Sequence, residues 1–131
     1  MNILVDTHIF LWWHSMPEKL PLHFRQHYED QQTTIYLSVA SIWEIQIKLQ
    51  IGKLRLNQSL ETILNLQQTA NQLQILPIAL RHVLNLARVP LIHKNPFDRL
   101  LIAQALADNL TIMTKDHVFA QYPIQTIPIQ P

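Results

Sequence analysis

Residues 95–108 read Asn-Pro-Phe-Asp-Arg-Leu-Leu-Ile-Ala-Gln-Ala-Leu-Ala-Asp and predict a helix that is apolar on almost every side. Asn95 and Pro96 suit the N-cap and the first turn of such a helix. A helix that is hydrophobic all round is buried in the protein interior. We therefore expect this helix to be central to the fold, with one carboxylate, Asp98, in its first turn.

Short apolar segments alternate with helical patterns on both sides of this helix. Residues 110–113, directly after it, and residues 3–5 have the apolar character of buried strands. Further strands are expected at 34–37, 75–78 and 125–127, and helices at 7–13, 21–30, 38–51, 59–72 and 79–87. This alternation predicts an α/β domain with a mainly parallel central sheet flanked by helices. The length of 131 residues suits a single domain, 1–131.

The composition excludes several classes of protein. The chain has no cysteine, which rules out disulfide scaffolds, thiol nucleophiles and cysteine-bound zinc. Its single glycine, Gly52, rules out the glycine-rich phosphate loops of nucleotide-binding proteins. No apolar run approaches the roughly 18 residues of a membrane span, and the N-terminus lacks the features of a signal peptide. We therefore expect a soluble, cytoplasmic protein with no membrane partner.

The nine carboxylates fall into two groups. Five are expected on solvated surface: Glu18, Glu29, Asp30, Glu61 and Asp108. The other four stand next to or within elements that are predicted to be buried: Asp6, Glu44, Asp98 and Asp116. In a parallel sheet, ligands bind outside the carboxyl ends of the strands, and two of these acids follow strands. Helices that begin at or cross the same edge would bring in the other two.

Each of the four acids, taken alone, also has an ordinary structural explanation. Asp6 could cap the helix that follows it, and Glu44 could pair with Lys48 one turn later. Asp98 could interact with the helix dipole, and Asp116 could be a loop acid. Gathered in one place, however, four carboxylates repel and need a cation. Mg²⁺ prefers carboxylate oxygens and water as ligands, which makes a divalent metal site the expected arrangement.

Six segments occur in order along the chain: LVDTH (4–8), LWW (11–13), SIWEI (41–45), PFDRLLIAQA (96–105), TKD (114–116) and FAQY (119–122). Together they resemble the PIN-domain family, and within it the VapC-type toxins of bacterial type II toxin–antitoxin modules. The resemblance extends over the whole chain. The segment at 96–105 is its most specific part, whereas Thr-x-Asp alone would be weak.

The resemblance implies a metal-dependent endoribonuclease that hydrolyses RNA phosphodiester bonds with a metal-activated water. It assigns four residues to catalysis and to one or two Mg²⁺ or Mn²⁺ ions: Asp6, Glu44, Asp98 and Asp116. It places Thr7 and Thr114 in positions that support the acids. Arg99 follows the third acid, where it could contact phosphate or pair internally.

The resemblance also implies partners. These are the RNA substrate, a second copy of the chain in a homodimer, and a VapB-type antitoxin whose C-terminal segment would block the acidic groove. Several apolar residues could contribute to such contacts or pack in the core: Trp12, Trp13, Ile42, Trp43, Ile45 and Ile47. Without the four site acids, ten Lys and Arg face five carboxylates. The metal-loaded protein would therefore be moderately basic, which suits an RNA partner.

Two alternatives remain open: an RNA-processing nuclease without an antitoxin, and a non-catalytic scaffold. Asn95 stands where the family often has an acid, and Asn109 where it often has glycine. We expect the first to serve as an N-cap and the second to adopt the left-handed conformation. The histidines are expected to have structural roles, although His8 and His93 lie near the site and His8 could touch substrate.

Overall fold

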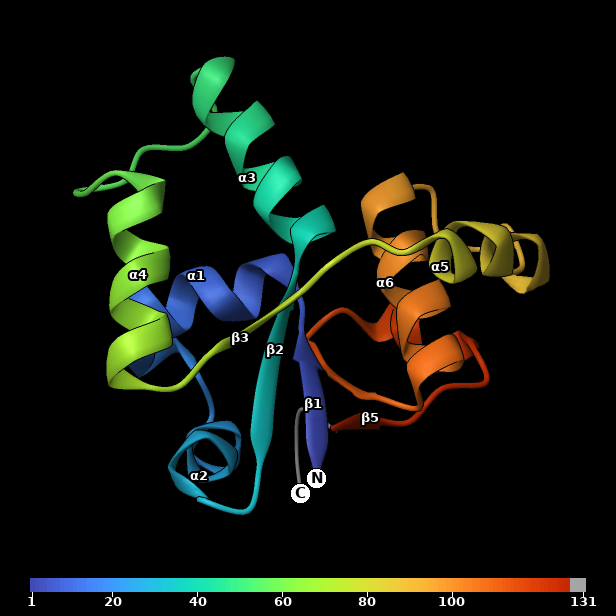
Figure 1. The fold of residues 1–131 in the computed structure, drawn as a ribbon, viewed down its shortest axis with the longest axis horizontal. Helices are drawn as coiled ribbons and strands as arrows, with labels where there is room; N and C mark the ends of the chain where they lie inside the picture. The colour runs from blue at the N-terminus through green and yellow to red at the C-terminus, as the bar shows by residue number, and fades with distance from the viewer. Residues whose placement is uncertain (128–131) are drawn as a thin grey trace.

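The computed structural model describes residues 1–127 and contains a five-stranded sheet (Figure 1). All strand pairs in it are parallel, in the order β3-β2-β1-β4-β5. The strands are β1 (Asn2–Val5), β2 (Thr34–Ser38), β3 (Gln74–Leu76), β4 (Thr111–Met113) and β5 (Thr126–Ile127). The predicted α/β class with a parallel central sheet is therefore confirmed, and each predicted strand is present within about two residues of its expected bounds.

Helices connect the strands and cover both faces of the sheet. They are α1 (Thr7–Ser15), α2 (Leu22–Glu29), α3 (Val39–Gln50), α4 (Leu60–Ala70), α5 (Leu80–Asn85) and α6 (Pro96–Asp108). Three short 3-10 helices add η1 (Pro17–Lys19), η2 (Leu86–Arg88) and η3 (His117–Gln121). The predicted helix at 79–87 is divided between α5 and η2, and η3 was not predicted. Within residues 1–127, no helix is both long and apolar enough to cross a membrane.

The central strand β1 divides the core into two halves. Ile3 and Val5 belong to one apolar cluster with α1, α2 and α4, whereas Leu4 belongs to a second cluster with α6. Alternate residues of a strand point to opposite faces of the sheet, so this division follows from the pleat. All three side chains are fully buried, as expected for a parallel sheet covered on both faces.

Helix α6 is the most deeply buried helix, as its sequence predicted. Six consecutive residues, 100–105, are buried. The polar member of this run, Gln104, accepts a hydrogen bond from Ser38 Oγ (2.6 Å) and donates to the Pro77 carbonyl (3.2 Å). These bonds tie α6 to the ends of β2 and β3, and they satisfy an amide that would be costly to bury unpaired. Asn109 ends the helix in the left-handed conformation (φ 55°), as expected.

Asp108 was predicted to be a solvated surface acid, and this prediction is wrong. Its carboxylate accepts two hydrogen bonds from Arg81, each 2.9 Å long, and its Oδ2 lies 2.8 Å from Nε2 of the fully buried His82. The Arg81 hydrogen bonds hold the pKa of this carboxyl below its ordinary value, with a further contribution from His82. The error has a physical reason, because the partners lie on α5 and meet α6 only in the folded protein.

The register of the sheet brings the ends of β1 and β4 together. Val5 pairs with Met113, so Asp6 and Thr114 follow adjacent strands at the same level. The Asp6 N–H donates to the Met113 carbonyl (3.1 Å), which extends the ladder by one bond. Helix α3 begins directly after β2 at this edge. In Figure 1, the first turn of α6 also faces this edge. The fold thus directs the predicted acids to one place.

Candidate metal centre

Asp6 lies at the end of β1 and is only 5% exposed. Its Oδ1 accepts a hydrogen bond from the Ile9 N–H (2.8 Å), which caps α1, and its Oδ2 accepts a short bond from the Thr114 hydroxyl. Burial raises the pKa of this carboxyl above its ordinary value, although these two hydrogen bonds oppose the shift. The expected cap of α1 is therefore present on one oxygen of Asp6, while Thr114 holds the other oxygen at the edge of the sheet.

Glu44 lies in the second turn of α3 and is 6% exposed. Its Oε1 accepts from the Thr7 hydroxyl (2.7 Å), and its Oε2 accepts from the Asn95 side-chain amide (3.1 Å). The expected pair with Lys48 is also present, with an N–O separation of 3.6 Å. Neutral donors from two other elements therefore fix this carboxylate, and the lysine alone does not account for its position.

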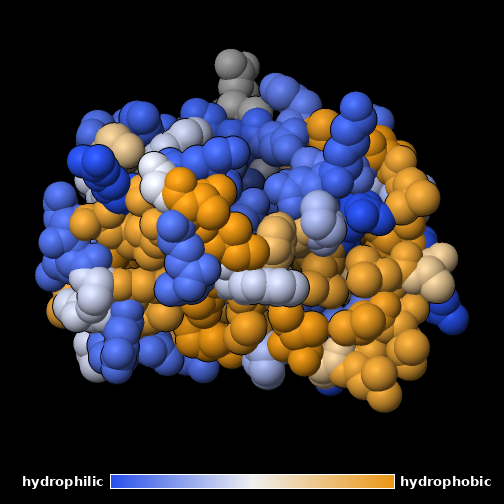
Figure 2. All heavy atoms as spheres, turned by 90° about the horizontal axis from the view of Figure 1, so that it is seen from above, coloured by the Kyte–Doolittle hydropathy of each residue, from blue (hydrophilic) through white to orange (hydrophobic). Residues whose placement is uncertain are grey.

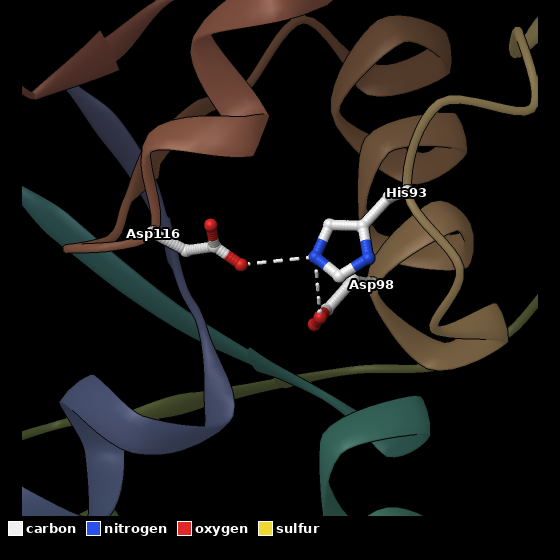
Figure 3. Close-up of side chains that lie close together, drawn as sticks. All are labelled: His93, Asp98 and Asp116. Atoms are coloured by element: carbon white, nitrogen blue, oxygen red, sulfur yellow. Dashed lines mark hydrogen bonds and ion pairs between the residues drawn. The ribbon is translucent and has the colours of Figure 1, made fainter.

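Asp98, Asp116 and His93 converge from three segments of the chain (Figure 3). The Nε2 atom of His93 lies 3.0 Å from Oδ2 of Asp98 and 2.9 Å from Oδ2 of Asp116. Asp98 is in the first turn of α6, and Asp116 caps η3 through a bond from the Val118 N–H to its Oδ1 (3.0 Å). The imidazole thus joins two acids that are 18 residues apart in the sequence.

The four predicted acids lie close enough for the charges of three of them to act on the fourth, Asp98. Burial raises the pKa of Asp98 to about 7, and the charges of Glu44, Asp6 and Asp116 act in the same direction. His93 has the opposite effect on this pKa. A proton is therefore retained on the cluster near neutral pH, which is the expected result when like charges share a partly buried place.

Asp116 differs from the two buried acids. Partial burial acts to raise its pKa, but hydrogen bonds from the Val118 N–H and from His93 hold the pKa of this carboxyl below its ordinary value. Asp116 therefore keeps its charge where Asp98 tends to keep a proton. Such a division of protonation states within one group of acids is common at functional sites.

The donor set suits a hard divalent cation. Carboxylate oxygens of Asp98 and Asp116 lie within 4.8 Å of one another and of a ring nitrogen of His93, and these three side chains are partly accessible. Asp6 and Glu44 add carboxylates that interact electrostatically with Asp98. Carboxylate oxygens with room for water are the ligands that Mg²⁺ favours. Among residues 1–127, the chemistry of this group therefore fits the metal that the sequence predicted.

The other residues that the sequence placed at or near the site differ in whether they contact the acids. Thr7 donates a hydrogen bond to Glu44, and Thr114 donates one to Asp6. Arg99 makes no hydrogen bond to the acids among the described residues, and its Nε is buried without a partner there. His8 is exposed, and its ring lies 6.2 Å from that of Trp12. Neither Arg99 nor His8 makes a hydrogen bond to the acids among the described residues, and His8 acts on Asp6 only through its charge.

His93 and the second role of Asn95 were missed from the sequence. His93 was expected to be structural, but it contacts two of the acids. Asn95 was expected only to cap α6, which it does with its side-chain oxygen, but its amide group also donates to Glu44. The sequence showed only that both residues lie just before the start of α6. Their partners, however, come from distant elements that only the fold brings near.

The sheet is parallel and has helices on both faces, which is the architecture of a large class of α/β proteins. In that class, ligands bind outside the carboxyl ends of the strands, where these acids lie. The family model that matches this chain is the PIN domain, over residues 3–125. The chain belongs to the PIN domain family. Comparison with curated protein sequences gave no match.

Solved structures support the same fold. A chain in the crystal structure of VapBC2 from Rickettsia felis, bound to a DNA fragment from its promoter, is similar with a TM-score of 0.76 at 17% identity, covering 98% of both chains. A chain of VapBC-1 from nontypeable Haemophilus influenzae has a TM-score of 0.71 at 18% identity, covering 100% of both. DNA-bound VapBC from Salmonella typhimurium gives 0.70 at 15% identity, covering 98% of both. At these identities the similarity shows the fold.

Replacing Asp98 with asparagine should stabilise the metal-free protein at high pH. Because the folded pKa is about 7 and the ordinary value is 3.8, the folded protein binds more protons than the unfolded chain between these values. Wild-type stability therefore falls as pH rises from about 4 to above 7. Asp98→Asn lacks this loss, so its free energy of unfolding at pH 8 should be higher by the order of 1–3 kcal/mol.

Urea unfolding with a chelator at pH 5 and pH 8 measures this difference. The exposed acid Asp30 provides the control, because Asp30→Asn should change stability little at either pH. A gain of equal size at both pH values, or a loss at pH 8, would contradict the assigned pKa of Asp98.

Proposed function

We propose that this protein is a divalent-metal-dependent endoribonuclease and the toxin of a type II toxin–antitoxin module, of the VapC type. The observation that carries the proposal is the assembled group of four carboxylates: Asp6, Glu44, Asp98 and Asp116. Hydroxyl and amide donors from three elements hold two of them. Membership of the PIN domain family and the VapBC structural neighbours support this function.

The residues of the chain have separate tasks in this proposal. The four acids hold one or two Mg²⁺ or Mn²⁺ ions, and Thr7, Thr114 and Asn95 orient the carboxylates. Such outer hydrogen bonds fix ligand geometry at metal sites generally. A bound ion would supply a water of lowered pKa and would stabilise negative charge on the scissile phosphate. No side-chain nucleophile is required, in agreement with the absence of cysteine.

Charge on the rest of the chain supports a polyanionic substrate. Apart from the four acids, ten Lys and Arg outnumber five carboxylates. Two of these cations lie beside the site: Lys48 is 3.6 Å from Glu44, and Lys115, next to Asp116, lies 4.9 Å from the centre of the Trp12 ring. Cations in such positions contact the RNA backbone and position the strand without reading its sequence.

An antitoxin peptide is the second proposed partner, and Trp43 marks its contact surface. This side chain is 56% exposed and packs edge-on against Phe97, which precedes Asp98. Of the other apolar residues that could contact a partner, Ile45 is fully buried and Trp13 stacks on Tyr28 at 4.2 Å. Core packing therefore accounts for Ile45 and Trp13, whereas Trp43, which contacts Phe97, is accessible to a partner.

A homodimer is the third proposed assembly, and it fits the apolar surface of α5. Figure 2 shows extensive hydrophobic surface on the side where Figure 1 places this helix. Five large apolar side chains of α5 and of the loop after η2 are exposed: Leu80, Val83, Leu84, Leu91 and Ile92. Exposed apolar groups of this size on neighbouring segments usually mark a protein interface.

The nuclease is tested with purified protein and total cellular RNA in the presence of Mg²⁺ or Mn²⁺. Cleavage is expected with the wild type, and a chelator should abolish it. Asp98→Asn and Asp6→Asn should lower the rate by more than about a hundredfold, because even outer partners of metal ligands cost 10–100-fold when lost. Glu61→Gln, which changes an exposed acid on α4, is the matched control and should cleave normally.

The protein used must be free of any bound partner. Full cleavage by Asp98→Asn with an unchanged metal requirement would remove that acid from the mechanism. Absence of cleavage by folded, partner-free wild type would favour the scaffold alternative.

The toxin role predicts a short reading frame just upstream that encodes a DNA-binding antitoxin. Its product, expressed together with this chain, should copurify with it and suppress RNA cleavage. Trp43→Ala should weaken this complex without lowering the cleavage rate of the free protein. If no such reading frame exists, and cleavage is confirmed, the RNA-processing alternative is the better description.

The dimer is tested by light scattering after size-exclusion chromatography. Wild type should show twice the monomer mass of 15.4 kDa. Leu84→Glu should shift the protein towards monomer, because it places charge in the proposed interface. Leu22→Glu alters an equally exposed leucine on α2 and should leave the dimer intact. A monomeric wild type, or the same effect from both variants, would contradict this interface.

A further inference from the structure

The imidazole of His93 has a defined tautomer in this structure. The Asn95 N–H donates a hydrogen bond to Nδ1 (3.1 Å), so Nδ1 carries a lone pair and acts as the acceptor. In a neutral imidazole the other nitrogen then carries the hydrogen. Nε2 is therefore a donor, and it points at Asp98 Oδ2 and Asp116 Oδ2. Its two contacts are those of an N–H group shared between two carboxylates (Figure 3).

This tautomer is the wrong one for a metal ligand. A histidine binds a metal through a nitrogen lone pair, and its other nitrogen usually donates its N–H to an acceptor. Here Nδ1 meets a backbone N–H instead of an acceptor. Coordination through Nε2 would move the ring hydrogen to Nδ1, where two N–H groups would face one another. His93 is thus built to donate to the acids.

The position of the ring is fixed by the surrounding loop. The Tyr122 hydroxyl accepts a hydrogen bond from the His93 N–H (2.7 Å) and donates to the Pro90 carbonyl (2.9 Å). The ring also packs edge-on against Phe119, with centroids 5.6 Å apart. Contacts from η3 and from the residue after it therefore hold His93 in place. In this position the Nε2 atom lies within hydrogen-bond distance of both acids.

We infer that His93 occupies the place of the cation in the metal-free protein and is displaced from Asp98 and Asp116 when the metal binds. This inference rests on the proposed metal site. The Nε2–H group joins the two carboxylates and relieves part of their repulsion while the cation is absent. The incoming ion must take over the same oxygens, so the histidine competes with it. His93 therefore weakens metal binding, whereas a ligand would strengthen it.

The sign of the effect on metal affinity distinguishes a competitor from a ligand. In His93→Asn, the side-chain oxygen can still accept from the Asn95 N–H, but the shorter side chain cannot reach the acids. His93→Gln keeps an N–H donor of similar reach. Titration of Mn²⁺ and of Mg²⁺ into metal-free protein by calorimetry should show tighter binding to His93→Asn, by roughly three- to tenfold, since bonds to charged groups are the stronger hydrogen bonds. His93→Gln should fall between the two.

Three calorimetric outcomes are decisive. Weaker binding to His93→Asn would make His93 a ligand and overturn the inference, and unchanged binding would overturn it as well. Absence of metal binding to the wild type would overturn both the inference and the proposed metal site. His117→Asn is the matched control, because His117 is exposed next to Asp116 and acts on it only through its charge, without a hydrogen bond to the acids among residues 1–127. Its affinity should stay close to that of the wild type and should not rise as it does in His93→Asn.

Imidazole ¹⁵N chemical shifts provide a second measurement on the unmodified protein. In metal-free protein, His93 should show a protonated Nε2 and an unprotonated, hydrogen-bonded Nδ1. Addition of diamagnetic Mg²⁺ should leave Nε2 protonated while its signal moves. Loss of the Nε2 hydrogen on Mg²⁺ binding, or two protonated nitrogens in the metal-free protein, would overturn the inference even if a variant failed to fold.

Discussion

The mutual repulsion of four carboxylates at one edge of the sheet is the constraint to which the surrounding structure responds. Asp6 and Glu44 are almost fully buried, and Asp98 has its pKa raised to about 7 by burial and by the other acids. Each acid is held by hydrogen-bond donors from other elements. The two threonines serve Asp6 and Glu44, and His93 serves the more accessible pair. The folded protein thus maintains a concentration of negative charge that a divalent cation would relieve.

Helix α6 links this site to the core. Its middle residues fill the interior on one side of β1, and its first turn presents Asp98 at the edge of the sheet. Asn95 connects the two regions, since it caps α6 and donates to Glu44 on α3. Gln104 anchors the same helix to the ends of β2 and β3. The geometry of the acids therefore depends on the packing of the best-buried helix, and errors in its position would be transmitted to the site.

The order of strands and helices was predictable because short apolar runs alternate with helical patterns. The four acids were singled out because Asp6 and Asp116 follow strands, whereas Glu44 and Asp98 lie in apolar helices. What could not be predicted depended on tertiary contacts. The sequence around Asp108 indicates a surface acid, because its partners Arg81 and His82 lie on α5 and contact it only in the folded protein. His93 lies in a loop, and nothing in its sequence neighbourhood indicates that Tyr122 and Phe119 direct its ring towards two acids. Local patterns specify elements and their ends, whereas loops acquire their roles from distant partners.

The most direct test of the central claim is a crystal structure of the protein grown with Mn²⁺, with anomalous diffraction data. The account predicts at least one strong anomalous peak within coordination distance of Asp98 and Asp116, bordered by Asp6 and Glu44, with the His93 ring moved away from its present contacts. An anomalous map with no peak among these four carboxylates, at a Mn²⁺ concentration that saturates the protein in solution, would contradict it.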